Sequence, residues 1–297
     1  MSDKMKSPVI VALGYFDSVH KGHLAVIERA IALAKKYSAV PLIFSFDGDL
    51  RSALKSFSGG CVFTKKERAK IFEKFSGAKV YFAPTTPEFL GMDKLSFLKF
   101  LEEKFNAIGY VFGEDYKFGS DFGDADFLTE YAELKNKAAD CVAAVKSSDG
   151  EKISTTEIKR LLSCGKVEVA NENLFVPYFI SGKVVKGRGV GKTLGFATAN
   201  VEFSKEKFLL RFGVYCGSAV IDGKLYPAVI NYGGKPTFGI SDFSVEAHFI
   251  GYNGDLYGKD IDLTFHGYIR EIKKFDSLTD LSERINIDVK YAEEKLK

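Results

Sequence analysis

The sequence predicts two domains of different class: an α/β domain with a parallel sheet, followed by an antiparallel β domain closed by a C-terminal helix. The 297 residues are enough for two domains of ordinary size. Up to about residue 145, short apolar runs alternate with helical patterns, which is typical of βαβ units. From residue 178 onward, glycine and aromatic residues become frequent, and alternating runs are separated by turn signals.

In the first half we expect strands and helices in alternation. The first strand, Val9–Leu13, is a continuous apolar run, and residues 22–37 have a helical period. The further expected strands are Val40–Phe46, Val80–Phe82, Tyr110–Phe112 and Cys141–Val145, and the further helices are Lys65–Phe75 and Ser96–Phe105. Because the two kinds of element alternate, a parallel sheet with helices on both faces is predicted.

The junction between the halves contains one more helix. Ser154 and Glu157 have the spacing of a capping box in front of the apolar stretch Ile158–Leu162. After Gly165 no sustained period is visible up to Pro177. We therefore expect the domains to comprise residues 1–172 and 173–297.

In the second half, a hairpin is the clearest signal. The runs Val214–Ile221 and Lys224–Asn231 flank Asp222-Gly223, a dipeptide that favours a tight hairpin turn. Two more strands are expected at Ser244–Ile250 and Ile261–Tyr268, and an amphipathic helix at 277–296. These elements predict a barrel or sandwich closed by a helix.

Composition excludes several classes of protein. Lys and Arg total 42 and Asp and Glu 39, with no long basic block, so a nucleic-acid partner is not expected. The sequence contains no apolar run of about 18 residues, so no membrane span is predicted. The four cysteines form no C-x-x-C pair, which argues against a zinc site and fits reduced thiols in the cytoplasm. The oligomeric state cannot be inferred from the sequence.

A candidate phosphate site follows the first strand, within Gly14–His23. Ligands of open α/β sheets bind at the carboxyl ends of strands, and a helix N-terminus favours phosphate. His20 and His23 stand three residues apart at the helix start, and Gly22 allows close approach of the backbone. This pattern predicts stabilisation of charge on a transferring phosphoryl or nucleotidyl group. The remaining residues assigned to this nucleotide site are Gly14, Phe16 and Asp17.

The H-x-G-H spacing resembles the HxGH nucleotidyltransferase superfamily, and two later segments resemble its FAD synthetase branch. These are Gly113–Gly119 (GEDYKFG) and Ile153–Lys159 (ISTTEIK). The resemblance implies a Rossmann-like fold, with Asp115 contacting nucleotide or metal. It implies that Ser154, Thr155 and Lys159 hold phosphates. Lys159 replaces the usual arginine and loses its bidentate fork, and Glu157 stands where a basic residue is frequent.

A glycine-rich loop in the second half fits neither common nucleotide motif. Lys186 occupies the position where a Walker loop requires glycine, and the glycine spacing also departs from the dinucleotide pattern. Yet the blocks that begin with this loop resemble riboflavin kinase, in order, over about residues 178–292. The further blocks are 213–215 (GVY), 231–239 (NYGGKPTFG), 245–249 (VEAHF), 255–258 (DLYG) and 269–275 (IREIKKF).

This second resemblance implies a six-stranded antiparallel barrel with a closing helix. It makes Glu246 the general base for the riboflavin 5′-hydroxyl, and Thr198 and Asn200 ligands of Mg²⁺ and the ATP phosphates, with Ala197 in place of the usual proline. It assigns two further groups: the phosphate-covering residues Gly187, Gly189, Gly191 and Lys192, and the flavin-binding residues Gly213, Val214, Tyr215 and Arg270.

Together the resemblances imply an enzyme that phosphorylates riboflavin to FMN and adenylylates FMN to FAD, with ATP as co-substrate and Mg²⁺ as cofactor. Three alternatives stay open. Lys159 and Glu157 motivate a riboflavin kinase whose first domain binds nucleotide without efficient transfer. The second alternative is a non-catalytic flavin-binding regulator, and the third is nucleotidyl transfer to an acceptor other than FMN.

Overall fold

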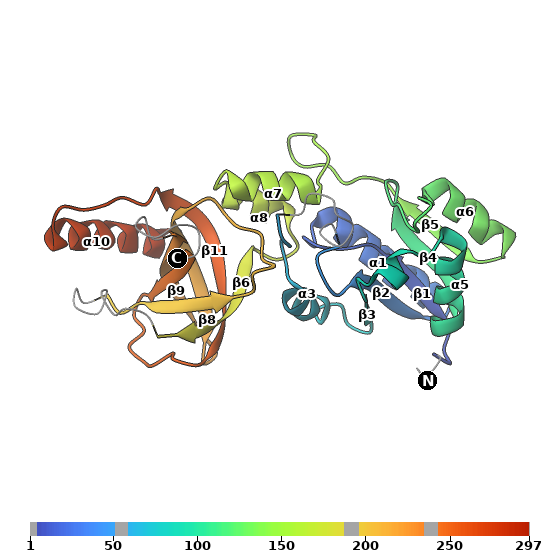
Figure 1. The fold of residues 1–297 in the computed structure, drawn as a ribbon, viewed down its shortest axis with the longest axis horizontal. Coiled ribbons are helices and arrows are strands. Elements are labelled where there is room, and N and C mark those ends of the chain that lie inside the picture. The colour runs from blue at the N-terminus through green and yellow to red at the C-terminus, as the bar shows by residue number, and fades with distance from the viewer. Residues whose placement is uncertain (1–4, 51–58, 187–195, 235–242, 297) are drawn as a thin grey trace. The chain divides into compact units, whose positions relative to one another are not determined.

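The computed structural model describes residues 5–50, 59–186, 196–234 and 243–296. The chain forms two compact units, Met1–Thr155 and Thr156–Lys297 (Figure 1). Helix α7 (Thr155–Ser163) starts at the junction and belongs almost entirely to the second unit. None of the helices in the described part of the chain has the length and apolar character that crossing a bilayer requires.

The first unit is a five-stranded parallel sheet with strand order β3-β2-β1-β4-β5 (Figure 1). The α/β prediction is therefore confirmed. The strands are β1 (Val9–Leu13), β2 (Val40–Phe46), β3 (Lys79–Ala83), β4 (Ala107–Gly113) and β5 (Ala138–Val142). The helices are α1 (Lys21–Lys36), α3 (Lys65–Phe72), α4 (Pro87–Leu90), α5 (Lys94–Phe105) and α6 (Ala125–Leu134).

Helices cover both faces of this sheet. Val9, Val11 and Leu13 on β1 share one core cluster with residues of α5 and α6, such as Leu101 and Leu128. The alternate side chains of β1 point to the opposite face, where α1 packs against β1, β2 and β4. All five residues of β1 are buried, which is why the central strand is a continuous apolar run in the sequence.

Several elements of the first unit differ from the predictions, among them the short helix α4, which was not predicted. Helix α6 was not predicted, although Asp124 caps it by accepting a hydrogen bond from the Phe127 backbone N–H at 3.0 Å. The last strand covers Ala138–Val142 rather than Cys141–Val145. It is an edge strand whose residues are half-buried or exposed, so it lacks the apolar run that marks the inner strands.

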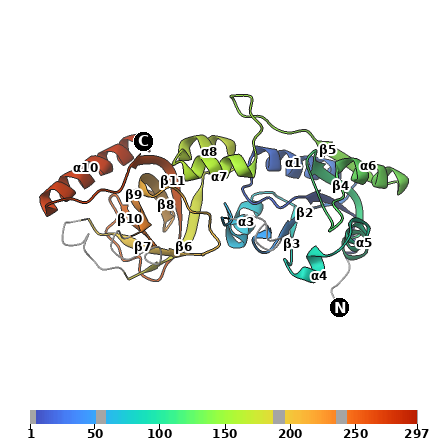
Figure 2. The same cartoon turned by 45° about the horizontal axis from the view of Figure 1, so that its top comes forward.

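The second unit is a closed six-stranded barrel with strand order β10-β7-β6-β11-β8-β9 and every pairing antiparallel (Figure 2). This confirms the barrel and rules out the sandwich. The strands are β6 (Phe179–Val185), β7 (Ala199–Phe203), β8 (Gly213–Ile221), β9 (Lys224–Gly234), β10 (Phe243–Phe249) and β11 (Asp260–Arg270).

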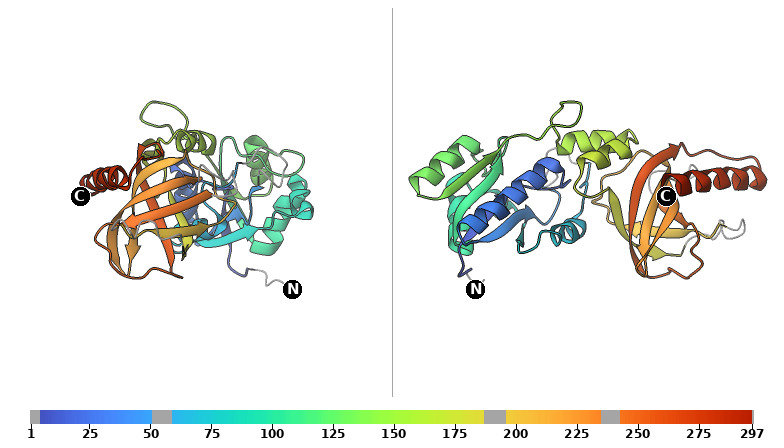
Figure 3. Two further views of the ribbon diagram at one scale, coloured as in Figure 1. Left: turned by 60° about the vertical axis from the view of Figure 1, so that its left-hand side comes forward. Right: turned by 180° about the vertical axis from the view of Figure 1, so that it is seen from behind.

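Helix α10 (Leu278–Lys295) lies against the outer wall of this barrel, beside β8 and β9 (Figure 3). Val214, Cys216 and Val229 on these strands pack with Ala292 of the helix. The alternate residues point into the barrel, where the rings of Tyr215, Tyr232 and Phe265 contact each other edge to face. The part of the wall that carries Val214, Cys216 and Val229 is thus buried on both sides.

A short helix, α8 (Val167–Asn173), occupies a segment for which no periodic element was predicted. Its Asn171 donates a hydrogen bond to the Phe265 carbonyl at 2.9 Å and accepts one from the Tyr178 backbone N–H at 2.8 Å. The helix has no side-chain N-cap, and seven residues are too few for a visible period. Tertiary contacts with β11, rather than local sequence, account for it.

Candidate functional sites

The candidate nucleotide site lies at the carboxyl edge of the parallel sheet. Strands β1 and β4 are neighbours in the sheet, and the strand order reverses between them. The loop after β1 carries His20, and the segment after β4 carries Asp115. A switch point of this kind is where open α/β sheets bind ligands, so the fold places the predicted residues at the expected edge.

The two histidines stack on each other at the start of α1. Their ring centroids are 3.7 Å apart with an interplanar angle of 17°. His20 is the N-cap of the helix: its Nδ1 accepts a hydrogen bond from the His23 backbone N–H at 3.2 Å. Because Nδ1 is an acceptor, the proton of the neutral His20 ring resides on Nε2. This hydrogen bond therefore defines the tautomer of the neutral His20 ring.

Burial keeps both histidines neutral. It lowers the pKa of His20 to about 4, with Lys152 adding in the same direction and Asp115 opposing. The pKa of His23 is lowered well below its ordinary value, first by burial, then by repulsion from His20 when that ring is protonated, and then by the positive charge of Arg68. Nδ1 of His23 is buried and has no hydrogen-bond partner within the described residues. A buried polar atom without a partner at a helix N-terminus points to a ligand that supplies one.

The loop between β1 and α1 has a strained backbone. Phe16 and Val19 adopt φ angles of +53° and +42°, a conformation that costs a non-glycine residue about 1–2 kcal/mol. A side chain at Gly14 would meet the Phe16 ring at 2.7 Å, and one at Gly22 would meet the His20 ring at 3.0 Å. Close packing thus requires glycine at position 14, whereas a side chain at position 22, in the first turn of α1, would need a small shift of the His20 ring.

Phe16 and Asp17 lie within the protein rather than on an open surface. Phe16 is 1% exposed, and its ring contacts His23 edge to face with centroids 5.3 Å apart. Asp17 is also 1% exposed, and its Oδ1 accepts a hydrogen bond from the Val62 backbone N–H at 2.8 Å. The structure therefore gives Phe16 and Asp17 packing roles around the histidines.

The residues predicted from the ISTTEIK segment lie at the start and in the first turns of α7, where they make different contacts. The Thr155 hydroxyl lies 2.9 Å from the Ser18 hydroxyl, which ties the start of α7 to the histidine loop, and half-buried Ser154 precedes it. Lys159 belongs to the second unit, where it is buried with its Nζ 5.5 Å from the centre of the Phe208 ring. Glu157 accepts two hydrogen bonds from Arg160.

Asp115 forms an ion pair that the sequence does not indicate. Its carboxylate lies 2.8 Å from Nζ of Lys152, and both side chains are exposed. Both charges act on the pKa of His20, in opposite directions. Lys152 is thus a basic group near the histidine pair, and it immediately precedes the ISTTEIK segment that was singled out.

In the second unit, the strand register brings the predicted kinase residues into one row. Glu246 on β10 stands opposite Asn200 on β7 and opposite Asn231 on β9. Asn231 stands opposite Val214 on β8, and Val214 opposite Arg270 on β11. Directly opposed residues share a face, so these five form one row on the outer wall of the barrel, where α10 packs. We call them the barrel row.

Asn231 was not predicted as a site residue. It is exposed and lies directly beside Glu246, on the side away from Asn200. The signal was present in the sequence, because Asn231 opens the NYGGKPTFG block that supported the resemblance. What was missing is the register between β9 and β10, which places Asn231 directly opposite Glu246.

The predicted flavin residues are adjacent to each other, but their side chains point in different directions. Tyr215 is fully buried inside the barrel, and its hydroxyl donates a hydrogen bond to the Arg211 carbonyl. Val214 faces α10. A side chain at Gly213 would meet the Tyr268 ring at 2.4 Å. Contacts from Gly213–Tyr215 to a ligand would therefore have to come from the backbone.

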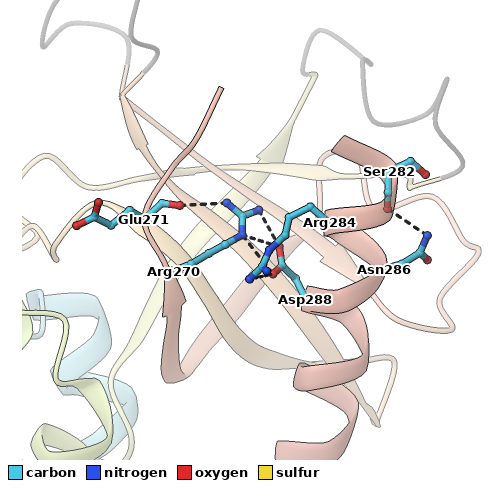
Figure 4. Close-up of polar contacts among 6 residues, drawn as sticks. All are labelled: Arg270, Glu271, Ser282, Arg284, Asn286 and Asp288. Carbon is cyan, nitrogen blue, oxygen red and sulfur yellow. Dashed lines mark hydrogen bonds and ion pairs between the residues drawn. The ribbon is translucent and has the colours of Figure 1, made fainter. Parts of the chain in front are cut away.

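The guanidinium of Arg270 is engaged by the C-terminal helix (Figure 4). Its Nε and Nη2 donate to the carboxylate of Asp288 at 3.0 and 2.7 Å, and its Nη1 donates to the Glu271 carbonyl at 3.0 Å. Asp288 is 1% exposed and also pairs with Arg284, one turn earlier on α10, at 3.1 Å. Arg270 thus ties the end of β11 to α10.

The phosphate-covering loop is outside the part of the chain that can be described. Gly187, Gly189, Gly191 and Lys192 fall within residues 187–195. Thr198 follows soon after and is exposed, two residues before Asn200. The Ala197 carbonyl lies 2.9 Å from Nδ1 of His248, so the segment that leads into β7 is attached to β10 beside Glu246.

Comparisons with known proteins cover almost the whole chain. Residues 2–157 match the family model of FAD synthetase, and residues 174–296 match that of riboflavin kinase. A bifunctional riboflavin kinase/FMN adenylyltransferase of Bacillus subtilis is 29% identical over 94% of this chain and 90% of that protein. The Pseudomonas fluorescens protein of the same name is 28% identical over the same shares. The expected domain boundary after residue 172 falls between the two matches and stays a prediction.

A solved structure agrees with the fold over its full length. The crystal structure of a protein described as a macrolide-efflux protein from Streptococcus pneumoniae has a TM-score of 0.86 to this chain. The two sequences are 26% identical, and the match covers 97% of this chain and 95% of the other. The arrangement of a parallel sheet followed by a closed barrel is therefore found in an experimental structure.

Proposed function

Because the chain belongs to the FAD synthetase family and continues into a riboflavin kinase domain, we propose that it makes FMN from riboflavin and then FAD from FMN, with ATP as the second substrate of both steps. It is a bifunctional transferase of the kind represented by the bacterial relatives. The observation that carries the adenylylation site is the stacked, neutral histidine pair at the switch point of the sheet.

In adenylyl transfer, a phosphate oxygen of FMN attacks the α-phosphorus of ATP, and pyrophosphate leaves. Negative charge develops on the triphosphate during this step and has to be stabilised. The neutral His20 ring donates from Nε2, and His23 can donate from Nδ1 if that nitrogen carries its proton. Both donors lie at the N-terminus of α1, where the helix dipole also favours negative charge.

In the kinase step, the Glu246 carboxylate accepts the proton of the riboflavin 5′-hydroxyl while that oxygen attacks the γ-phosphorus of ATP. The phosphorus–oxygen bond to ADP breaks, and ADP leaves. Phosphoryl transfer depends mainly on positioning and on neutralisation of charge. The barrel row supports this role, because it places the carboxylate of Glu246 between two amide side chains on adjacent strands.

The residues at this end of the barrel fit Mg²⁺. The Thr198 hydroxyl, the Asn200 amide oxygen and the Glu246 carboxylate are hard oxygen donors, and Glu246 and Asn200 stand opposite each other. We propose that Thr198 and Asn200 hold the metal together with the ATP phosphates. The bound ion would neutralise phosphate charge, while the residues of this chain orient the hydroxyl and accept its proton.

The compartment we propose is the cytoplasm. All four cysteines are free thiols, and Cys141 and Cys164 are exposed, which fits a reducing environment. The substrates we propose are small molecules, namely riboflavin, FMN and ATP.

One observation favours a second candidate function, a riboflavin kinase whose first unit binds nucleotide but transfers it poorly. Lys159, which was expected to hold phosphates, is 8% exposed and lies against Phe208 in the second unit. If this burial limits transfer, Lys159→Arg and Glu157→Arg will raise the rate of FAD formation. If the first unit is fully active, neither substitution will raise it.

The experiment is product separation by chromatography after incubation with ATP and Mg²⁺, with riboflavin in one tube and FMN in the other. FMN followed by FAD in the first tube, and FAD in the second, is the expected result. His23→Asn should abolish FAD formation in both tubes and leave FMN formation intact. Glu246→Gln should abolish FMN formation from riboflavin and leave FAD formation from added FMN intact, so each variant is the control for the other. No product in either tube would contradict the proposed function.

A further inference from the structure

A fully buried arginine lies beneath the histidine loop. Arg68 is on α3 and is 0% exposed. Its Nη1 donates to the Tyr15 carbonyl at 3.0 Å and to the Ser45 hydroxyl at 2.5 Å, and its Nη2 donates to the Phe46 carbonyl at 2.8 Å. Tyr15 follows β1, whereas Ser45 and Phe46 end β2. One guanidinium therefore joins the carboxyl ends of the neighbouring strands β1 and β2.

Ser45 contacts both Arg68 and the Tyr15 carbonyl. It is also 0% exposed, and its hydroxyl accepts from Arg68 while donating to the Tyr15 carbonyl at 2.7 Å. The Tyr15 carbonyl thus receives two hydrogen bonds immediately before Phe16, the first residue of the strained loop. The aromatic rings of Tyr15 and Phe82 lie 5.0 and 5.5 Å from the guanidinium carbon.

The segment that carries Arg68 is attached to the same loop at a second point. The backbone N–H groups of Val62 and Phe63 donate to the side chain and the carbonyl of Asp17, respectively. Thr64 then starts α3 with a complete capping box to Glu67, which fixes the helix next to Arg68. Two left-handed residues persist in a loop only when their surroundings hold them, and this segment provides that support.

The charge of Arg68 is also unusual. A buried arginine is normally paired with a carboxylate, because an unpaired buried charge is costly. Within the described residues Arg68 forms no ion pair, its oxygen partners are two carbonyls and one hydroxyl, and its Nε has no partner. Its positive charge acts on His23, lowering the pKa of that ring. The buried carboxylate of Asp17 opposes the effect of this charge on the pKa of Tyr15 and of Cys61, and an anionic ligand beside the histidines would compensate the charge further.

We propose that Arg68 is a positioning residue for adenylyl transfer: it fixes the Tyr15 carbonyl to the end of β2, holds the strained loop that aims His20 and His23, and supplies positive charge beneath the nucleotide. This inference rests on the proposed function, because it concerns the same site. Arg68 acts through the loop and contacts neither substrate. Neither composition nor a sequence motif indicated it.

The geometry and the charge can be separated by two substitutions. Arg68→Lys keeps the charge but loses the fork that reaches three oxygens, and Arg68→Met loses both. For Arg68→Lys we expect kcat for FAD formation to fall about 10- to 100-fold, since misplaced catalytic groups have effects of this size. The KM for FMN should change much less. Arg29→Gln, which removes an exposed arginine from α1 in the same unit, is the matched control.

The pH profile of FAD formation distinguishes this role from simple support of the fold. The charged groups that act on the two rings are Asp115 and Lys152 on His20, and Arg68 and His20 itself on His23. Removing the Arg68 charge should move the acid limb of the profile to higher pH in Arg68→Met. The limb should stay in place in Arg68→Lys and in Arg29→Gln. A limb that moves equally in the Lys and Met variants would overturn the role assigned to the charge.

Ser45→Ala keeps the test decisive if the Arg68 variants do not fold. It removes one of the two hydrogen bonds to the Tyr15 carbonyl, so kcat should fall several-fold without a shift of the acid limb. Unchanged kcat in Ser45→Ala and in both Arg68 variants, with a wild-type chain that forms FAD, would overturn the inference alone. A wild-type chain that forms no FAD from FMN would overturn the proposed function itself.

Discussion

The hydroxyls of Ser18 and Thr155 lie 2.9 Å apart, although the two residues are separated by 137 positions in the chain. Ser18 is fully buried in the loop that carries the histidines, and Thr155 is the first residue of α7. The contact therefore joins the beginning of the nucleotide site to the segment that was expected to hold phosphates from a helix start.

Removing this contact should loosen both segments. Ser18→Ala is expected to lower the free energy of unfolding by about 1–2 kcal/mol, because the half-buried Thr155 hydroxyl loses its partner. Thr155→Ala alone should have a similar effect. In a double-mutant cycle the two changes should be non-additive by about 1 kcal/mol, measured by urea unfolding. Strictly additive effects would show that the two hydroxyls contribute independently.

The stability of the first unit should depend on pH through His20. The folded pKa is about 4 and the unfolded value is near 6.5, so between these values the unfolded chain binds more protons. Stability is therefore unaffected above about pH 6.5 and is lost as the pH falls below it. Between pH 7 and pH 5 the loss should be on the order of 2 kcal/mol.

His20→Asn provides the comparison, since asparagine retains the N-cap of α1 without a titrating ring. Urea unfolding of both proteins at pH 7 and pH 5, followed by circular dichroism, measures the difference. The unfolding transition of the first unit should be less sensitive to pH in His20→Asn than in the wild-type protein. Equal pH sensitivity in the two proteins would mean that His20 is not the group that titrates.

The ion pair between Arg270 and Asp288 should matter for stability as well as for the kinase step. Asp288→Asn leaves two arginines beside a neutral buried group, and the expected loss is about 3–5 kcal/mol. Arg284→Gln keeps the bidentate pair and should cost about 1 kcal/mol or less. Thermal unfolding measures both, while FAD formation from FMN should persist in each. Equal losses would argue against a special role of Arg270.

Asn231 should contribute to FMN formation because it stands opposite Glu246. We expect Asn231→Ala to lower kcat for riboflavin phosphorylation about 10-fold or more, the size found when one preorganised polar group is removed from a reacting centre. Lys224→Ala, at the other end of β9, is the control and should retain full activity. A normal rate in Asn231→Ala would limit the functional part of the barrel row to Glu246 and Asn200.

The elements that bury continuous or amphipathic apolar surface could be predicted from sequence. Strand β1 and helices α1 and α10 have nearly the predicted bounds, because each is defined by its own periodicity. The histidine pair was also predictable, since two histidines three residues apart after a buried strand have few structural explanations. Helix α6 could have been found from its Asp124 cap.

The side-chain contacts that could not be predicted are those between residues far apart in the sequence. The local sequence of Arg68 does not show that its guanidinium reaches the ends of two strands. The register that sets Arg270 opposite Val214, and the ion pair of Arg270 with Asp288, require the paired strands and the docked helix. The burial of Lys159 likewise follows from packing against Phe208, which no motif encodes.

The two units differ in how they protect their strand edges from other chains. A closed barrel leaves no row of unpaired backbone groups to which a foreign strand could add. The open sheet has two such rows, on β3 and β5, and each carries charge: β3 begins at Lys79, and β5 includes Asp140 in its ion pair with Arg29. If the chain aggregates under stress, these two edges of the first unit are where intermolecular pairing should begin, and neutralising Asp140 should accelerate it.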